Sequence, residues 1–193
     1  MLDITEQGMV NNERVQPTRR LAIEKTALIA IHGIIVHQTG GGTAQSSLDS
    51  YLRQGANGAH FLIDKDGVIY QTASLNQQTW HVGSLKARCV VETRCTPVET
   101  AALRKFSPSG ENRREMAKLS PQRYPANVDA VGIELVGKPG TDGIYEKVTD
   151  LQNASLSWLI QNLTSTFNVP MTEIFRHPDV SRKTQSEAAT ARW

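Results

Sequence analysis

The sequence predicts an α/β domain built on a central mixed β-sheet flanked by helices. Three observations predict this class: an almost continuously apolar segment at 27–37, a hairpin signal at 60–70, and an amphipathic segment at 149–167. Strand and helix patterns therefore alternate along the chain, which is typical of a sheet covered by helices. A length of 193 residues suits a single domain with a substantial core.

Composition excludes several classes of protein. The chain is 39% hydrophobic and 21% charged, as in ordinary globular domains. Its net charge of +2 is too small to indicate nucleic-acid binding. It contains no apolar run of the roughly 18 residues that a membrane span needs. A loose basic cluster at 104–123 is either a solvated helical surface or a means of attraction to an anionic cell envelope.

The N-terminal part of the chain predicts an arm followed by the first core strand. Residues 1–20 have no apolar periodicity and no secretory h-region, so we expect an N-terminal arm and a domain spanning 21–193. The apolar segment Ala27–His37 predicts a strand buried on both faces. Glycines at 40–42 end that strand, and 46–55 predicts a short helix closed by Gly55.

A hairpin and a polar insertion come next. Two β-prone runs, 60–63 and 68–70, flank the turn sequence Asp-Lys-Asp-Gly. The chain is then polar over 84–127, which predicts an insertion with short helices, one of them capped by Thr96. Cys89 and Cys95 lie six residues apart in this insertion, a spacing compatible with a disulfide loop or with two free thiols.

The C-terminal part predicts a strand, a long helix and a strand followed by a loop. An apolar strand at 130–137 carries a single acid, Glu134. Thr149 and Gln152 resemble a capping box, and the helix that they begin ends near 168–170. A short strand at 173–176 precedes a polar tail.

Two histidines and one carboxylate form the candidate site. Strand alternation turns Glu134 away from the face of Ile133 and Leu135, either toward solvent or toward a site. His37 and His177 each follow a predicted strand, and both could meet Glu134 at one edge of the sheet. Two histidines beside an acid make a candidate metal site.

Five segments carry a resemblance to a known family: IIVHQTGG, AHFLIDKDGVIYQ, TWHVG, VGIELVG and FRHPDVSRK. Their order and content resemble the zinc-dependent N-acetylmuramoyl-L-alanine amidases of the type 2 amidase family. That family is related to the peptidoglycan recognition proteins and to bacteriophage lysozyme-amidases. The resemblance runs from Ile34 to the C-terminus and implies a mixed sheet with one zinc ion in a groove on one face.

The resemblance also implies roles for individual residues. It makes His37 and His177 zinc ligands and Glu134 the general base that activates water. Lys183 is the candidate for stabilising the oxyanion, with a solvated loop lysine as the alternative. Trp80 and His81 are expected to contact substrate along the groove, with packing in the core as the alternative for Trp80.

Two further histidines are not expected to take part in the site, and one tyrosine of the family pattern is missing. His60 is expected to be a structural histidine of the hairpin, and His32 belongs to no motif. Ala59 stands where family members often carry a tyrosine, so that supporting role is unfilled or is supplied from elsewhere.

The third metal ligand is where the sequence departs from the family pattern of an Asp or Cys. Gln185 lies eight residues after His177, and Glu187 lies ten residues after it. Alignment of the Arg-Lys-Thr stretch favours Gln185. Chemistry favours Glu187, because zinc prefers an anionic ligand to a neutral amide oxygen. We therefore expect Glu187 to be the ligand.

The function that these residues predict is hydrolysis of the amide between N-acetylmuramic acid and the L-alanine of the stem peptide, in peptidoglycan or muropeptides. Two alternatives are a non-catalytic peptidoglycan-binding module of the same fold and a zinc peptidase that cuts peptide cross-links. The expected place of action is the periplasm or cell wall, as for an endolysin or an antibacterial effector delivered without a signal peptide. A cytoplasmic recycling role is the alternative. An immunity or delivery partner is left unspecified.

Overall fold

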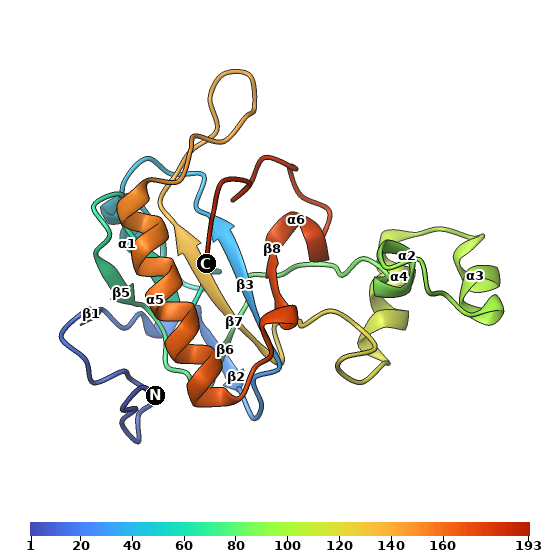
Figure 1. Ribbon diagram of the computed structural model, residues 1–193, viewed down its shortest axis with the longest axis horizontal. Coiled ribbons are helices and arrows are strands. Elements are labelled where there is room, and N and C mark those ends of the chain that lie inside the picture. The colour runs from blue at the N-terminus through green and yellow to red at the C-terminus, as the bar shows by residue number, and fades with distance from the viewer.

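A mixed six-stranded sheet forms the centre of the computed structural model, which describes residues 1–193 (Figure 1). Neighbouring strands are parallel except for the β4–β5 pair, which forms the predicted hairpin. The strand order is β1 (Val15–Pro17), β5 (Ile69–Gln71), β4 (Phe61–Ile63), β7 (Ala130–Leu135), β3 (Gly33–Gln38) and β8 (Ile174–Arg176). An antiparallel pair, β2 (Glu24–Ala27) and β6 (Gln77–Thr79), stands apart. The predicted fold class is confirmed.

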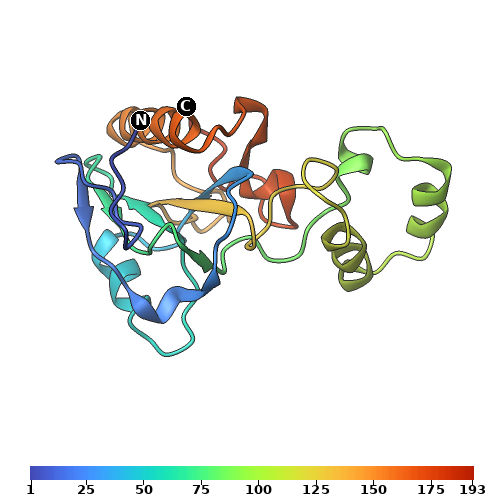
Figure 2. The same ribbon diagram turned by 90° about the horizontal axis from the view of Figure 1, so that it is seen from below.

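Helices cover both faces of the sheet, and further helices form a lobe at its side. Figure 2 shows the long helix α5 (Asp150–Phe167) above the sheet and α1 (Ala44–Ser50) below it. Short helical turns complete the fold: η1 (Leu21–Ile23), η2 (Met171–Glu173) and α6 (His177–Val180). Three helices form a lobe that projects from the side: α2 (Arg88–Val91), α3 (Pro97–Leu103) and α4 (Pro108–Met116). None of these helices combines the length and the apolar character needed to cross a bilayer.

Strand alternation divides the two central strands between a core face and a site face. On β3, Ile34 and Val36 join the main hydrophobic core, which also contains apolar residues of α5. On β7, Ile133 and Leu135 join the same core. The residues that alternate with these along each strand therefore point to the opposite face, and they include His37 and Glu134.

Capping fixes the long helix that closes the core. The Thr149 hydroxyl accepts a hydrogen bond from the Gln152 backbone N–H, and the Gln152 side-chain oxygen accepts one from the Thr149 backbone N–H, which confirms the predicted capping box. The Gln152 amide also donates to the carbonyl oxygens of Ile63 and Val136, so the start of the helix is bound to β4 and to the end of β7. The helix ends at Asn168 in the left-handed conformation.

The segment 27–37 is not one strand, and that prediction is wrong. β2 ends at Ala27 and β3 begins at Gly33, in a different sheet. Between them Ile29 is 91% exposed, while the backbone N–H of Leu28 donates to Asn76 and that of His32 to Asp129. An apolar run alone cannot distinguish a buried strand from an exposed crossover.

The N-terminal residues 1–20 pack against the core of the protein. Leu2, Val10 and Val15 are buried in the main core, and β1 pairs in parallel with β5 at the edge of the sheet. The backbone N–H of Leu2 also donates to the Thr166 side chain on α5.

Buried ion pairs attach the lobe to the rest of the domain. Arg88 makes two hydrogen bonds to Glu173 in η2, each of 2.8 Å. Glu111 on α4 accepts from the Ala87 backbone and from Arg182, which lies in the loop after α6. Cys89 forms a disulfide with Cys95, which decides between the two alternatives left open by the sequence.

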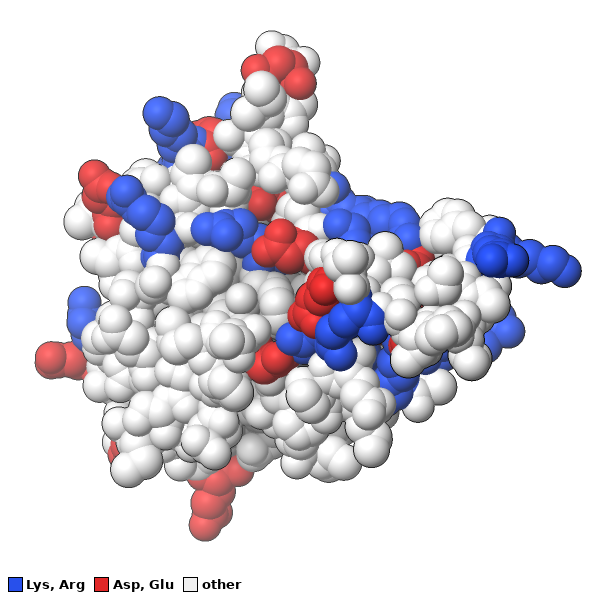
Figure 3. Space-filling model, turned by 45° about the vertical axis from the view of Figure 1, so that its right-hand side comes forward, with Lys and Arg blue, Asp and Glu red and all other residues white.

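Only some of the basic residues at 104–123 lie on the surface. Figure 3 shows Lys and Arg side chains over the projecting lobe. Arg104, Lys105 and Arg113 are exposed, whereas Arg123 is buried in an ion pair with Asp129. The cluster is therefore divided between surface charge and internal structure.

Candidate metal centre

Three elements bring the candidate ligands to one edge of the sheet. His37 and Glu134 are register partners on the parallel strands β3 and β7, so their side chains lie next to each other on the site face. His177 follows β8, the other neighbour of β3, and begins α6. Carboxyl ends of parallel strands share one edge, which is where binding sites of open α/β sheets form.

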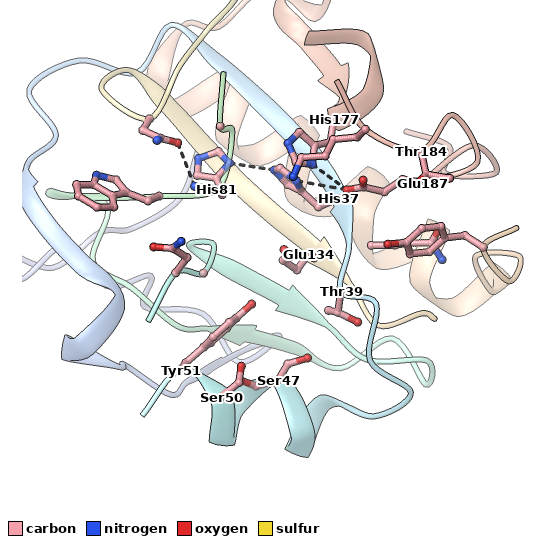
Figure 4. A pocket seen from close by; sticks show the side chains of 18 residues that line it. His37, Thr39, Ser47, Ser50, Tyr51, His81, Glu134, His177, Thr184 and Glu187 are labelled. Carbon is pink, nitrogen blue, oxygen red and sulfur yellow. Dashed lines mark hydrogen bonds and ion pairs between the residues drawn. The ribbon is translucent and has the colours of Figure 1, made fainter. Parts of the chain in front are cut away.

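A His-His-Glu cluster lies at this edge (Figure 4). Oε1 of Glu187 is 2.9 Å from Nδ1 of His177 and 3.7 Å from Nδ1 of His37. All three side chains are buried, and one donor atom from each lies within 4.8 Å of the others. The cluster therefore has the size of a metal site.

The protonation of the cluster suits a cation. Desolvation lowers the pKa of His37 to about 4, against the opposing effect of Glu187, so its imidazole is neutral at pH 7. Burial raises the pKa of Glu187, but its contacts with His177 and His37 outweigh burial and bring the pKa to about 2. The neutral His37 imidazole, the His177 imidazole and the Glu187 carboxylate together form a ligand set that zinc enzymes use.

The Glu134 carboxylate supports the same interpretation. Its Oε2 atom is buried and has no hydrogen-bond partner within the protein. Burial raises the pKa of Glu134 to about 8, the charge of Glu187 adds to this rise, and Lys183 opposes it. A buried carboxylate oxygen without a partner is costly in a folded protein, and its presence beside the cluster indicates a reacting group or ligand from outside the chain.

A polar groove of about 640 Å³ opens over the cluster. Its walls include all the residues that the sequence proposed for the site: His37, Trp80, His81, Glu134, His177, Lys183 and Glu187. Gln185, the alternative third ligand, is exposed and does not line the groove. Geometry therefore favours Glu187 over Gln185.

Trp80 and His81 differ in their surroundings. Trp80 is 54% exposed, with Lys25 Nζ 5.2 Å from its ring centroid, so it belongs to the groove wall and not to the core. His81 faces inward, and its Nδ1 lies 2.9 Å from Nε2 of His37. It therefore contacts a candidate ligand directly.

Sequence reasoning missed three further residues around the groove. Tyr51, at the end of α1, and Tyr145 line it, and burial followed by the charges of nearby glutamates raises the pKa of both hydroxyls. Asn127 lines it too and accepts hydrogen bonds from the backbone N–H groups of His81 and Val82. No local pattern marks these residues, because tertiary folding alone brings them to the site.

The two other histidines lie outside the metal cluster. His60 is fully buried, and its ring nitrogens contact the Gln77 carbonyl and the Thr79 hydroxyl. That environment is structural, as the sequence led us to expect. His32 pairs with Asp129 at 3.1 Å and does not line the groove.

Comparisons with known proteins agree with this architecture. A family model described as N-acetylmuramoyl-L-alanine amidase matches residues 27–188. The fold is similar to that of a solved AmpD structure, with 18% identity over 95% of this chain and 90% of the other and a TM-score of 0.58. For a structure of PlyL the identity is 12%, the coverage 88% and 84%, and the TM-score 0.56.

The third structure is PGRP-SA of Apis mellifera, with 16% identity, 86% coverage of each chain and a TM-score of 0.51. At such identities structural likeness shows the fold alone. No curated protein matches the sequence.

Proposed function

Because the chain belongs to the N-acetylmuramoyl-L-alanine amidase family, we propose that it hydrolyses the amide between N-acetylmuramic acid and the L-alanine of the stem peptide. One zinc ion held by His37, His177 and Glu187 is the proposed cofactor. The observation that carries this proposal is the complete His-His-Glu cluster beside the unpartnered carboxylate oxygen of Glu134. A module that only binds peptidoglycan would need neither feature.

The groove suits a substrate made of sugar and peptide. Most of its lining is polar, and hydroxyl groups of Thr39, Ser47 and Ser50 border it (Figure 4). Hydroxyl and amide groups of a glycan–peptide junction can exchange hydrogen bonds with such a surface. Trp80 offers an exposed aromatic face at the rim, a surface on which a sugar ring can pack.

The chain's own residues divide the chemistry between them. When bound, zinc supplies Lewis acidity, which polarises the scissile carbonyl and lowers the pKa of water to about 7. The positive charge of bound zinc would favour the ionised form of Glu134. The carboxylate accepts the proton of the attacking water through its free oxygen and then donates it to the leaving amine of L-alanine. Lys183 faces the same groove and stabilises negative charge on the carbonyl oxygen.

The proposed place of action is the cell wall or periplasm. The Cys89–Cys95 disulfide supports this location, because such bonds persist mainly in oxidising compartments. The substrate of the family is also found there.

Product analysis tests the proposal. The zinc-loaded protein is incubated with purified peptidoglycan, and soluble products are identified by mass spectrometry. We expect intact stem peptides with a free N-terminal L-alanine, and glycan strands that keep their N-acetylmuramic acid. Cleavage within the cross-links would instead identify a zinc peptidase. Binding to the wall without any product would identify a recognition module.

A further inference from the structure

His81 lies where it can control the protonation of a metal ligand. Its Nδ1 is 2.9 Å from Nε2 of His37, and its Nε2 is 3.4 Å from the carbonyl oxygen of Ala130. His81 therefore lies between a candidate zinc ligand and a backbone acceptor. These two contacts fix which nitrogen of each ring carries the proton.

The Ala130 carbonyl decides the direction of the hydrogen bonds that link it through His81 to His37. A carbonyl oxygen only accepts, so Nε2 of His81 carries a hydrogen and donates a hydrogen bond to Ala130. A neutral His81 then has an unprotonated Nδ1, which accepts from Nε2–H of His37. The remaining nitrogen of His37, Nδ1, is left with a free lone pair directed toward Glu187. That atom is the one a metal requires.

The opposite arrangement is disfavoured at Ala130, and it leaves His37 unable to bind a metal. If Nδ1 of His81 were the donor, its Nε2 lone pair would face the lone pairs of the Ala130 carbonyl. Nε2 of His37 would then accept, and the proton of its neutral ring would sit on Nδ1, which blocks coordination. The position of Ala130 thus favours the form that binds metal.

Local structure holds the His81 ring in place. Asn127 accepts from the backbone N–H groups of His81 and Val82, at 3.0 and 2.8 Å. Gly132 on β7 leaves room for the ring, since a Cβ there would lie 2.8 Å from Cγ of His81. The neighbouring Val82 carbonyl accepts from Nε2 of His177 at 2.8 Å, which frees Nδ1 of that ligand as well. One short segment therefore orients both histidines.

We infer that His81 is a positioning residue for the metal centre: it accepts the Nε2 proton of His37 and so keeps Nδ1 of His37 free to bind zinc. This inference rests on the zinc site proposed above and differs from the substrate contact that the sequence suggested for His81. It predicts a graded dependence of zinc affinity on the acceptor at residue 81, because second-layer partners of ligand histidines usually change metal affinity by about 10- to 100-fold.

Variants at residue 81 test the inference through zinc affinity, measured by competition with a chromogenic chelator. His81→Ala removes the acceptor and should weaken zinc binding by about 10- to 100-fold. His81→Asn places an amide oxygen near the former Nδ1 and should recover most of the affinity. His32→Ala is the matched control, because His32 lies outside the groove, and it should bind zinc like the wild type. Equal affinity of His81→Ala and wild type would overturn the inference.

A second measurement does not depend on zinc or on these variants. Long-range ¹H–¹⁵N correlation spectra of the metal-free wild-type protein report the tautomer of each histidine. We expect the proton of His37 on Nε2, and a His37 proton on Nδ1 would overturn the inference.

Gly132→Ala displaces the His81 ring without changing either histidine, and it should weaken zinc binding in the same direction as His81→Ala.

These measurements also separate this inference from the proposed function. If the wild type binds zinc tightly but releases no product from peptidoglycan, the proposed hydrolysis fails and the positioning role of His81 stands. If peptidoglycan is cut but His81→Ala binds zinc like the wild type, only the positioning role fails.

Discussion

Replacement of Glu134 by glutamine separates a general base from a structural acid. The amide fills the same space but cannot carry the proton between water and the leaving amine. We expect Glu134→Gln to keep its zinc and to lose about 10²- to 10⁴-fold in kcat, the usual contribution of general acid–base catalysis. Product release from peptidoglycan and zinc content are measured on the same preparation. Glu13→Gln, which changes an exposed acid outside the groove, is the control.

The structure adds a second signature of the same substitution, in the metal-free protein. Burial and the charge of Glu187 raise the pKa of Glu134 from 4.5 to about 8. Between these values the folded state binds more protons than the unfolded state, so stability falls as pH rises. At pH 9 the ionised carboxylate costs at most about 5 kcal/mol, because each pKa unit corresponds to about 1.4 kcal/mol. Glutamine avoids this cost.

Urea denaturation of the metal-free proteins measures this difference. Glu134→Gln should be more stable than the wild type at pH 9, and the advantage should shrink toward zero near pH 4. A carboxylate with a structural role would show the reverse, a loss of stability on substitution. The reasoning is refuted if kcat falls by less than about tenfold, which is too little for a general base, or if the glutamine variant is less stable than the wild type at pH 9.

Three further predictions concern the ligands and the hairpin. Chelation should abolish peptidoglycan hydrolysis and added zinc should restore it, whereas full activity of His37→Ala after exhaustive chelation would contradict the mechanism. Glu187→Ala should lose bound zinc while Gln185→Ala retains it; loss of metal from the Gln185 variant alone would reverse the ligand assignment. Desolvation lowers the pKa of buried His60 from 6.5 to about 4, so the metal-free protein should lose up to about 3 kcal/mol of stability as pH falls through this range. A shallower pH dependence of urea stability in His60→Gln would support that origin, and an unchanged one would contradict it.

Local signals in the sequence predict those parts of the fold that local physics determines. The hairpin turn and the caps at Thr96 and Thr149 involve residues within a few positions of one another, and each produces the expected element. β1 has no such signal: Val15–Pro17 is a strand only because β5 lies beside it. The crossover at 28–32 is apolar like a strand, so only its tertiary hydrogen bonds reveal that the chain changes sheets there.

Some residues of the candidate site could be identified from the sequence, and others could not. Residue type and strand position were enough to select His37, His177 and Glu134, because strand ends and isolated buried acids are visible in sequence. The contact between His81 and His37 was not visible, since it joins β3 to a segment 44 residues away. Asn127 and Tyr51 were missed for the same reason.

The choice between Glu187 and Gln185 depends on how the C-terminal loop is held. Ala188, next to Glu187, has a left-handed backbone with φ of 53°, which costs a non-glycine residue about 1 kcal/mol or more. Hydrogen bonds maintain it: the Ala188 N–H donates to Gln38 at 2.8 Å, and its carbonyl accepts from Arg176 at 3.0 Å.

Gln38 follows the candidate ligand His37, and Arg176 precedes the candidate ligand His177. The strands that carry the two histidines therefore also fix the backbone beside the third candidate ligand. Gln185 lies before this anchored residue, in the exposed part of the loop. A spacing of ten residues after His177 brings an acid to the candidate metal cluster because the loop is anchored at Ala188, which alignment of the Arg-Lys-Thr stretch could not reveal.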